Sequence, residues 1–144
     1  MVNNEIYEIY AIKYAHSERR TGDNFIGGDA HDGPMPLDYF VWAITNKKRT
    51  IILDTGFSLD TAKIRGRDYL RNPGVGLGMI GIEPSKIKNV IISHMHYDHS
   101  GNEKLFPNAI YHLQDSEMAF CTGRNMCHET INLSLIHISE PTRP

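Results

Sequence analysis

The sequence predicts an α/β fold in a single domain, and three observations lead to that prediction. The chain has 144 residues, 40% of them hydrophobic, which is enough for one domain with a core and short for two. In the second half, short runs rich in Val and Ile alternate with stretches of helical pattern, as in a layered α/β architecture. A cluster of polar residues also follows directly after one apolar run, and ligand sites of α/β sheets favour the carboxyl ends of strands.

The first half is expected to be mainly β-structure. Ile6–Tyr14 alternates imperfectly between β-branched or aromatic residues and other types, as a partly buried strand does. The Gly- and Pro-rich segment His16–Asp38 is predicted to be a long loop, and loops of that length are usually functional or disordered. Tyr39–Thr45 and Thr50–Leu53 are predicted to pair as a hairpin around a polar turn.

Helices and strands are expected to alternate in the second half. A helix is predicted over Ser58–Leu70, capped by Ser58 or Asp60. The glycine-rich segment Asn72–Gly81 is predicted to be a mobile loop; its G-x-G-x-x-G spacing lacks the preceding strand that a dinucleotide site requires. The remaining expected elements are a helix or turn at Pro84–Lys88 with Ser85 as its N-cap, a strand at Asn89–Ile92, a polar loop at His94–Asn102, a strand at Ala109–Leu113 and a helix at Asp115–Cys121.

Composition narrows the classes of partner and location. The net charge is −2 and no basic stripe is present, so we expect no nucleic-acid partner. No apolar run approaches the ~18–20 residues of a membrane span, and we expect no membrane partner. The N-terminus lacks the basic start and apolar stretch of a signal peptide, and Cys121 and Cys127 are too few for a disulfide scaffold. The expected location is therefore the cytoplasm.

Three of the eight histidines fall within residues 94–99, which read His-Met-His-Tyr-Asp-His. On an extended segment, residues two apart point to the same side, so the imidazoles of His94 and His96 can reach one cation. A turn after the strand can aim Asp98 and His99 at a neighbouring cation. Imidazole and carboxylate ligands suit Zn²⁺, with Mn²⁺ or Fe as alternatives, and two metal ions ~3.5–4 Å apart can share a hydroxide that acts as nucleophile.

The pattern His-x-His-x-Asp-His after an apolar strand, with Leu53-Asp54-Thr55-Gly56 about forty residues earlier, resembles the metallo-β-lactamase fold hydrolases. The segment Gly81–His94, which leads into the pattern, is similar to the N-acyl-homoserine lactonase branch. The resemblance covers about Tyr7 to Gln114. It implies that the chain forms the first half of an αβ/βα sandwich, with two zinc ions at one edge of the sheets.

The resemblance also implies roles for the clustered residues. His94 and His96 would belong to the first metal site, and Asp98 and His99 to the second, each site taking further ligands from a later part of the fold. His112 and His128 do not lie in the contexts of those later ligands. The chain is therefore expected to hold four of the usual ligands, and the substrate-positioning residues of the second half are not expected in it.

Two carboxylates carry further expectations. Asp98 is expected to be the catalytic residue, because it can bind a metal and accept a hydrogen bond from the nucleophilic hydroxide. By resemblance, Asp54 braces the metal-binding loop from outside the set of ligands. The alternative for Asp54 is a turn carboxylate that bonds its own backbone.

The final segment Leu133–Pro144 resembles the translation of an adapter used in sequencing libraries. We therefore expect residues 1–132 to be the amino-terminal half of a metallo-β-lactamase-fold domain and residues 133–144 to be a non-native tail. An ordinary tail with a strand at Leu133–Ile138 is the alternative.

The expected function is a metal-dependent hydrolase that opens the lactone ring of N-acyl-homoserine lactones by attack of a metal-bound hydroxide, with the 144-residue chain itself inactive. Its partner would be a small-molecule lactone or ester. Two alternatives remain open at this stage. One is another hydrolase of the same fold, of the thioesterase, phosphodiesterase or β-lactamase type, because fold alone does not fix function. The other is an inert, truncated metal-binding fragment.

Overall fold

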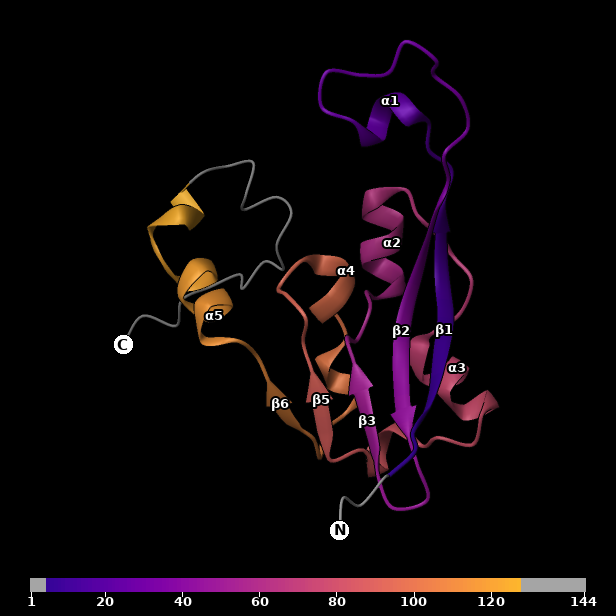
Figure 1. The fold of residues 1–144 in the computed structure, drawn as a ribbon, viewed down its shortest axis with the longest axis vertical. Coiled ribbons are helices and arrows are strands. Elements are labelled where there is room, and N and C mark those ends of the chain that lie inside the picture. The colour runs from indigo at the N-terminus through magenta and orange to yellow at the C-terminus, as the bar shows by residue number, and fades with distance from the viewer. Residues whose placement is uncertain (1–4, 128–144) are drawn as a thin grey trace.

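The computed structural model describes residues 5–127, in which six strands form one mixed sheet in the order β4-β1-β2-β3-β5-β6 (Figure 1). The strands are β1 (Glu8–Ser17), β2 (Leu37–Thr45), β3 (Thr50–Leu53), β4 (Asp68–Tyr69), β5 (Asn89–Ile91) and β6 (Ile110–His112). The α-helices are α1 (Thr21–Asn24), α2 (Leu59–Arg65), α3 (Pro73–Met79), α4 (Tyr97–Ser100) and α5 (Asp115–Thr122), with 3₁₀ turns η1 (Pro84–Lys86), η2 (Glu103–Leu105) and η3 (Arg124–Cys127). The predicted tail at 133–144 and the predicted boundary at 132 lie outside the described residues.

The sheet combines an antiparallel half with a parallel half. Strands β1, β2 and β3 are antiparallel neighbours, and the predicted hairpin is confirmed, with Thr45 opposite Thr50. Strands β3, β5 and β6 run parallel, and the register aligns Leu53 with Ile91 and Ile91 with His112. Parallel pairing brings the carboxyl ends of β3 and β5 together, and the segments that follow them begin side by side.

One face of the sheet holds the hydrophobic core. Val41, Ile52 and Val90, from three neighbouring strands, are fully buried. Phe57, Leu77 and Phe106, from the connecting segments, are buried with them and join the same cluster. The core therefore lies between the sheet and the segments that cross over it.

The opposite face of the sheet is apolar and partly exposed. The register places Ala11, Trp42, Leu53, Ile91 and His112 in one row across five strands. Trp42 and Ile91 are 38% and 37% exposed, and Ile9 on β1 is 65% exposed. We call this surface the open face.

The segment between β3 and η1 differs most from the sequence-based expectation. The predicted helix from Ser58 is capped by Ser58, whose Oγ accepts from the Thr61 amide, but it ends at Arg65 because Gly66 takes a left-handed conformation. The predicted mobile loop Asn72–Gly81 is instead helix α3, so that prediction was wrong. Asn72 caps α3 and Pro73 occupies its first turn, both of which are favourable helix starts. Ser85 lies inside η1, and Glu83 occupies the N-cap position that was predicted for Ser85.

The connection between β1 and β2 is ordered around one carboxylate. Asp32 accepts hydrogen bonds from the Arg20 guanidinium, the Thr21 hydroxyl and the Gly22 amide. The connection carries the one-turn helix α1 and extends beyond the end of the sheet (Figure 1). No helix in residues 5–127 is long and apolar enough to cross a bilayer.

Candidate metal centre

The centre begins where β3 and β5 end. The Asp54 amide donates to the Ile91 carbonyl at 2.8 Å, which continues the parallel ladder by one step. Asp54 then adopts a φ of 65°, a left-handed conformation that Asp tolerates better than most residues. The chain turns there, and the Asp54 carboxylate, in a residue only 4% exposed, reaches the segment after β5.

The Asp54 carboxylate accepts three hydrogen bonds. Its Oδ1 accepts from the Ser93 amide at 2.8 Å, and its Oδ2 accepts from the Ser93 hydroxyl at 2.9 Å. Oδ2 also lies 2.7 Å from Nδ1 of His99. These partners lie on the segment that carries the histidines, so Asp54 connects that segment to the end of β3.

The structure brings the predicted ligands together in two pairs. Nε2 of His94 lies 3.1 Å from Nδ1 of His96, and their rings meet edge to face. Nε2 of His99 lies 3.4 Å from Oδ2 of Asp98. The rings of His94 and His99 are 4.0 Å apart between centroids, so the two pairs adjoin one another.

The local structure explains this arrangement. The chain bends at Ser93 as it leaves the sheet, His96 has extended backbone, and the first turn of α4 begins at Tyr97. His94 and His96 therefore keep the two-residue spacing of a strand, whereas Asp98 and His99 occupy a helical turn. The predicted polar loop at 94–102 thus contains a short helix, because its second half closes one α-turn.

The environment shifts the acidity of three of these groups. Burial lowers the pKa of His94, and the neighbouring imidazoles of His99 and His96 lower it further. Burial alone would lower the pKa of His99, but its hydrogen bonds to Asp54 and Asp98 outweigh that effect and raise it to about 9. Burial would raise the pKa of Asp98, but the interactions with His99 and His96 outweigh it and hold that pKa below its usual range.

The donor atoms fit divalent metal ions. Two nitrogen ligands with Zn–N bonds of ~2.0–2.1 Å in a tetrahedral site lie roughly 3.3 Å apart. The 3.1 Å and 3.4 Å separations in the two pairs are close to that value. Within residues 5–127, no group of three His, Cys, Asp or Glu side chains converges on one position. The described part of the chain therefore brings potential metal ligands together in pairs.

Other residues, which were not predicted from the sequence, hold the backbone of the cluster. The Thr55 amide and hydroxyl both donate to the His99 carbonyl, at 2.6 and 3.2 Å. The Met95 amide donates to Oε1 of Glu117 on α5 at 2.8 Å. The Tyr14 hydroxyl donates to the Asp98 carbonyl at 2.9 Å, and burial raises the pKa of Tyr14 well above its usual range. Thr55 directly follows Asp54, so its position in the sequence could have indicated its role, whereas Tyr14 and Glu117 carry no signal in the sequence.

The other described histidines lie elsewhere. His16 contacts Asp38 and Glu18, and His112 on β6 contacts Asn89 at 3.0 Å. His31 is exposed in the connection between β1 and β2. His128 lies outside the described residues.

A small cavity adjoins Asp98 and His99. Its volume is about 240 Å³, and the side chains that line it with them come from β2. They are Leu37, Asp38, Tyr39, Phe40 and Trp42. The ion pair between the Asp98 and His99 side chains therefore borders a recess with an aromatic wall and one additional carboxylate.

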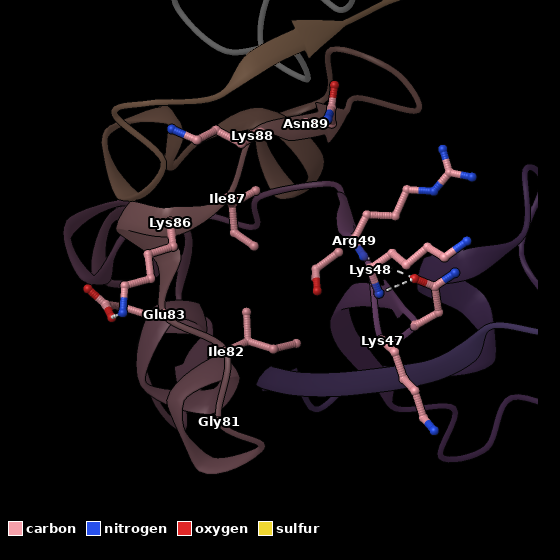
Figure 2. Close-up of a pocket in the computed structure, with 12 residues that line it drawn as sticks. Lys47, Lys48, Arg49, Gly81, Ile82, Glu83, Lys86, Ile87, Lys88 and Asn89 are labelled. Atoms are coloured by element: carbon pink, nitrogen blue, oxygen red, sulfur yellow. Dashed lines mark hydrogen bonds and ion pairs between the residues drawn. The ribbon is translucent and has the colours of Figure 1, made fainter.

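A larger cavity of about 450 Å³ lies away from the histidines, between the β2–β3 turn and the segment around η1 (Figure 2). Ile82 and Ile87 face its interior, whereas the charged ends of Lys47, Lys86 and Lys88 point away from it in Figure 2. Lys86 pairs with Glu83 at 2.6 Å. The basic residues there form a solvated rim around an apolar floor.

Three known proteins are similar to this chain in sequence or in fold. An N-acyl homoserine lactonase of Azorhizobium caulinodans, AttM, is 29% identical over 106 residues, which are 65% of this chain and 40% of that protein. A probable metal-dependent hydrolase from Staphylococcus aureus superposes with a TM-score of 0.62 at 19% identity, covering 79% of this chain and 49% of the other. A quorum-quenching N-acyl homoserine lactone lactonase superposes with a TM-score of 0.61 at 18% identity, covering 82% and 49%.

The chain thus spans 40% of the length of the curated relative and about half of each of these solved structures. The α/β fold, with its single mixed sheet, matches about half of the metallo-β-lactamase fold, as the sequence predicted. Residues 34–113, more than half of the chain, match the family description and include Asp54 and residues 94–99. The chain belongs to the metallo-beta-lactamase superfamily.

Proposed function

We propose that this chain contributes half of a dinuclear zinc centre that opens the lactone ring of N-acyl-homoserine lactones. The observation that carries the proposal is the pairing of four donor atoms, His94 with His96 and Asp98 with His99, around the buried Asp54. The relative from Azorhizobium is named as a lactonase of this kind, which supports the choice of substrate. One superposed N-acyl homoserine lactone hydrolase holds N-hexanoyl-L-homoserine at its catalytic metal centre.

Bound zinc ions would supply a Lewis acid for the lactone carbonyl and a nucleophilic hydroxide at neutral pH, and Mn²⁺ or Fe can occupy such ligands as well. His94 and His96 would hold one ion, and Asp98 and His99 the other. Asp98 would also accept a hydrogen bond from the nucleophile and fix its direction. Because each pair offers two ligands, the remaining ligands would come from a part of the protein outside residues 5–127.

Asp54 prepares His99 for this role. The Asp54 carboxylate accepts a hydrogen bond from Nδ1 of His99 and orients the ring so that Nε2 lies toward Asp98, where Nε2 would be the nitrogen that binds a metal ion. The Ser93 hydroxyl lies between Asp54 and Nδ1 of His94, at 2.9 and 3.0 Å, and extends the same support to the first pair.

The recess beside Asp98 would receive the substrate. Phe40 and Trp42 offer apolar contact, which suits an acyl chain, while Asp98 and His99 close one end. The Asp38 carboxylate in its wall is held by Lys13 at 2.6 Å.

The test compares two proteins. One is the 144-residue chain, and in the other residues 1–132 are followed by the carboxy-terminal half of a solved homoserine lactonase. We expect weak zinc binding and no turnover from the first, and two zinc ions and lactone hydrolysis from the second. Zinc is counted by mass spectrometry, and hydrolysis is followed by proton release. His94→Ala should abolish binding of one ion, whereas the control His112→Ala, on β6, should not.

The same assay separates the alternatives. If the joined protein hydrolyses a thioester, a phosphodiester or a β-lactam faster than a lactone, its function is another hydrolase activity of the same fold. A joined protein that folds but binds no zinc would overturn the proposal and indicate that this chain is an inert fragment. Two zinc ions and lactonase activity in the 144-residue chain itself would contradict the expectation that further ligands are needed.

A further inference from the structure

Tyr14 occupies an irregularity in β1. Lys13 pairs with Phe40 and Ala15 pairs with the adjacent Tyr39, so Tyr14 has no partner on β2. Its carbonyl instead accepts hydrogen bonds from the amides of Leu70 and Arg71 at the far edge of β1. Such bulges bend a strand and redirect a side chain, and they are over-represented beside active sites.

The bulge directs the Tyr14 side chain toward residues 94–99, which carry the four proposed metal ligands and which we call the metal-binding segment. The side chain is fully buried and packs edge to face on Phe57, with ring centroids 4.9 Å apart. The ring also fills the space beside Gly56, where an added Cβ would lie 2.8 Å from the ring carbon Cζ. This packing fixes the position of the hydroxyl, which donates to the Asp98 carbonyl at 2.9 Å.

Helix α4 depends on such external donors. It contains only four residues, and the amides that could continue its hydrogen bonding are used elsewhere. The Gly101 amide donates to the Gly56 carbonyl, and the Asn102 amide donates to the Thr55 hydroxyl. The Asp98 carbonyl, which the Asn102 amide would reach in a longer helix, accepts from the Tyr14 hydroxyl instead, and the His99 carbonyl accepts from Thr55.

We propose that Tyr14 is a positioning residue for the second metal site, because its hydroxyl fixes the rotation of the turn that presents Asp98 and His99. The inference rests on the proposed function. The first site depends on the extended segment at His94 and His96, which Tyr14 does not contact through a hydrogen bond. Loss of the hydroxyl should therefore weaken one ion and spare the other.

The test uses Tyr14→Phe in the joined protein, in which residues 1–132 are followed by the carboxy-terminal half of a solved homoserine lactonase, with Tyr69→Phe as the matched control. Tyr69 is a partly buried tyrosine of the same aromatic cluster, its ring centroid 6.3 Å from that of Phe57, and none of the hydrogen bonds to the metal-binding segment comes from it. Each protein is titrated with Co²⁺ and followed by visible absorption, and its unfolding by urea is measured without metal. We expect Tyr14→Phe to weaken the second cobalt ion about tenfold or more and to leave the first unchanged.

A second measurement needs no metal. Amide hydrogen exchange in residues 98–101 should be faster in Tyr14→Phe than in wild type or Tyr69→Phe, while exchange in β2 and β3 stays the same. Equal exchange, or equal cobalt binding in Tyr14→Phe and wild type, overturns the positioning role. An equal loss of both ions with a general loss of stability also overturns it, because that is a structural effect alone. A joined protein with wild-type residues 1–132 that folds and binds no cobalt overturns the proposed function, whereas equal cobalt binding in Tyr14→Phe and wild type overturns the positioning role alone.

Discussion

Oδ2 of Asp54 lies 2.7 Å from Nδ1 of His99, although the two residues are 45 positions apart in the sequence. This contact joins the end of β3 to the helical turn after β5, and it leaves Nε2 as the imidazole nitrogen of His99 that faces Asp98. Asp54 thus holds His99, one member of the second donor pair, in place.

Replacing Asp54 by Asn should weaken metal binding about 10- to 100-fold, the usual effect of removing a carboxylate behind a ligating histidine. Asn also tolerates a φ of 65°, so the backbone turn is retained. The amide NH₂ of Asn would face a donor of Ser93 or His99, and the two donors cannot hydrogen-bond with each other. This loss would lower the free energy of unfolding by about 1–3 kcal/mol. Zinc titration and urea unfolding check both effects. The exposed Asp60→Asn should change neither, and unaltered zinc affinity in Asp54→Asn would contradict the bracing role.

Replacing Asp98 by Asn should keep the fold and sharply reduce hydrolysis in a protein that carries the complete set of ligands. The amide is a poorer metal ligand and cannot accept a proton from the nucleophile. The rate of lactone opening measures the loss of activity, and the circular dichroism spectrum checks that the fold is retained. Asp115→Asn, at the exposed start of α5, serves as control. Turnover within a factor of a few of wild type would remove Asp98 from the mechanism.

Gly56→Ala should destabilise the protein through two separate costs. Gly56 has a φ of 71°, which costs a residue with a side chain about 1–2 kcal/mol. The added Cβ would also collide with the Tyr14 ring at 2.8 Å, and overpacking costs about 1–3 kcal/mol. Gly66→Ala is the matched control, because its φ is 61° and the space around it is open. Urea unfolding should show a larger loss for Gly56→Ala, and equal losses would mean that the ring moves aside freely.

His16 should make stability depend on pH. Its hydrogen bonds to Asp38 and then to Glu18 raise its pKa, while the pKa of Asp38 is lowered by Lys13 and by His16. A histidine whose pKa is higher in the folded state stabilises the folded protein at pH values below its unfolded pKa of about 6.5. This stabilisation is lost as the pH rises through the folded-state pKa. The His16→Gln variant should therefore differ from wild type more at about pH 5 than at about pH 9 in urea midpoint. The exposed His31→Gln is the control, and a difference that grows with pH would contradict the assignment.

The open face should cause the 144-residue chain to self-associate. A sandwich buries the inner face of each sheet against the other, and this chain matches about half of such structures. Trp42→Lys or Ile91→Lys should reduce the association seen in sedimentation velocity, because a charge would be buried in the contact. Ile64→Lys, on the 85% exposed Ile64 of α2, should have little effect. A monomeric wild-type chain at high concentration would contradict this prediction.

The parts that the sequence predicted correctly are those set by local patterns. Thr50–Leu53 was predicted with its observed bounds, because two short apolar runs on either side of a polar turn specify a hairpin within a few residues. The spacing of residues 94–99 likewise brought His94 and His96 together, since an extended backbone fixes that geometry locally.

The parts that the sequence did not reveal depend on distant contacts. Helix α3 contains three glycines, which disfavour a helix, yet Gly76 packs where a Cβ would lie 2.4 Å from Cγ2 of Ile12. The close approach of α3 to β1 requires that glycine, and composition alone suggested a loop. The Tyr14 bulge is similar, because only the register between β1 and β2 reveals it.

The parallel pairing of β3 with β5 has a consequence for how the protein folds. Neighbouring parallel strands form only after the intervening crossover has closed, whereas the β2–β3 hairpin can form from nearby residues. Asp54 meets Ser93 only in the register that aligns Leu53 with Ile91, and a slip of one residue would turn every side chain of the strand to the other face. Asp54 can therefore support His99 only after this late, long-range step is complete and in register.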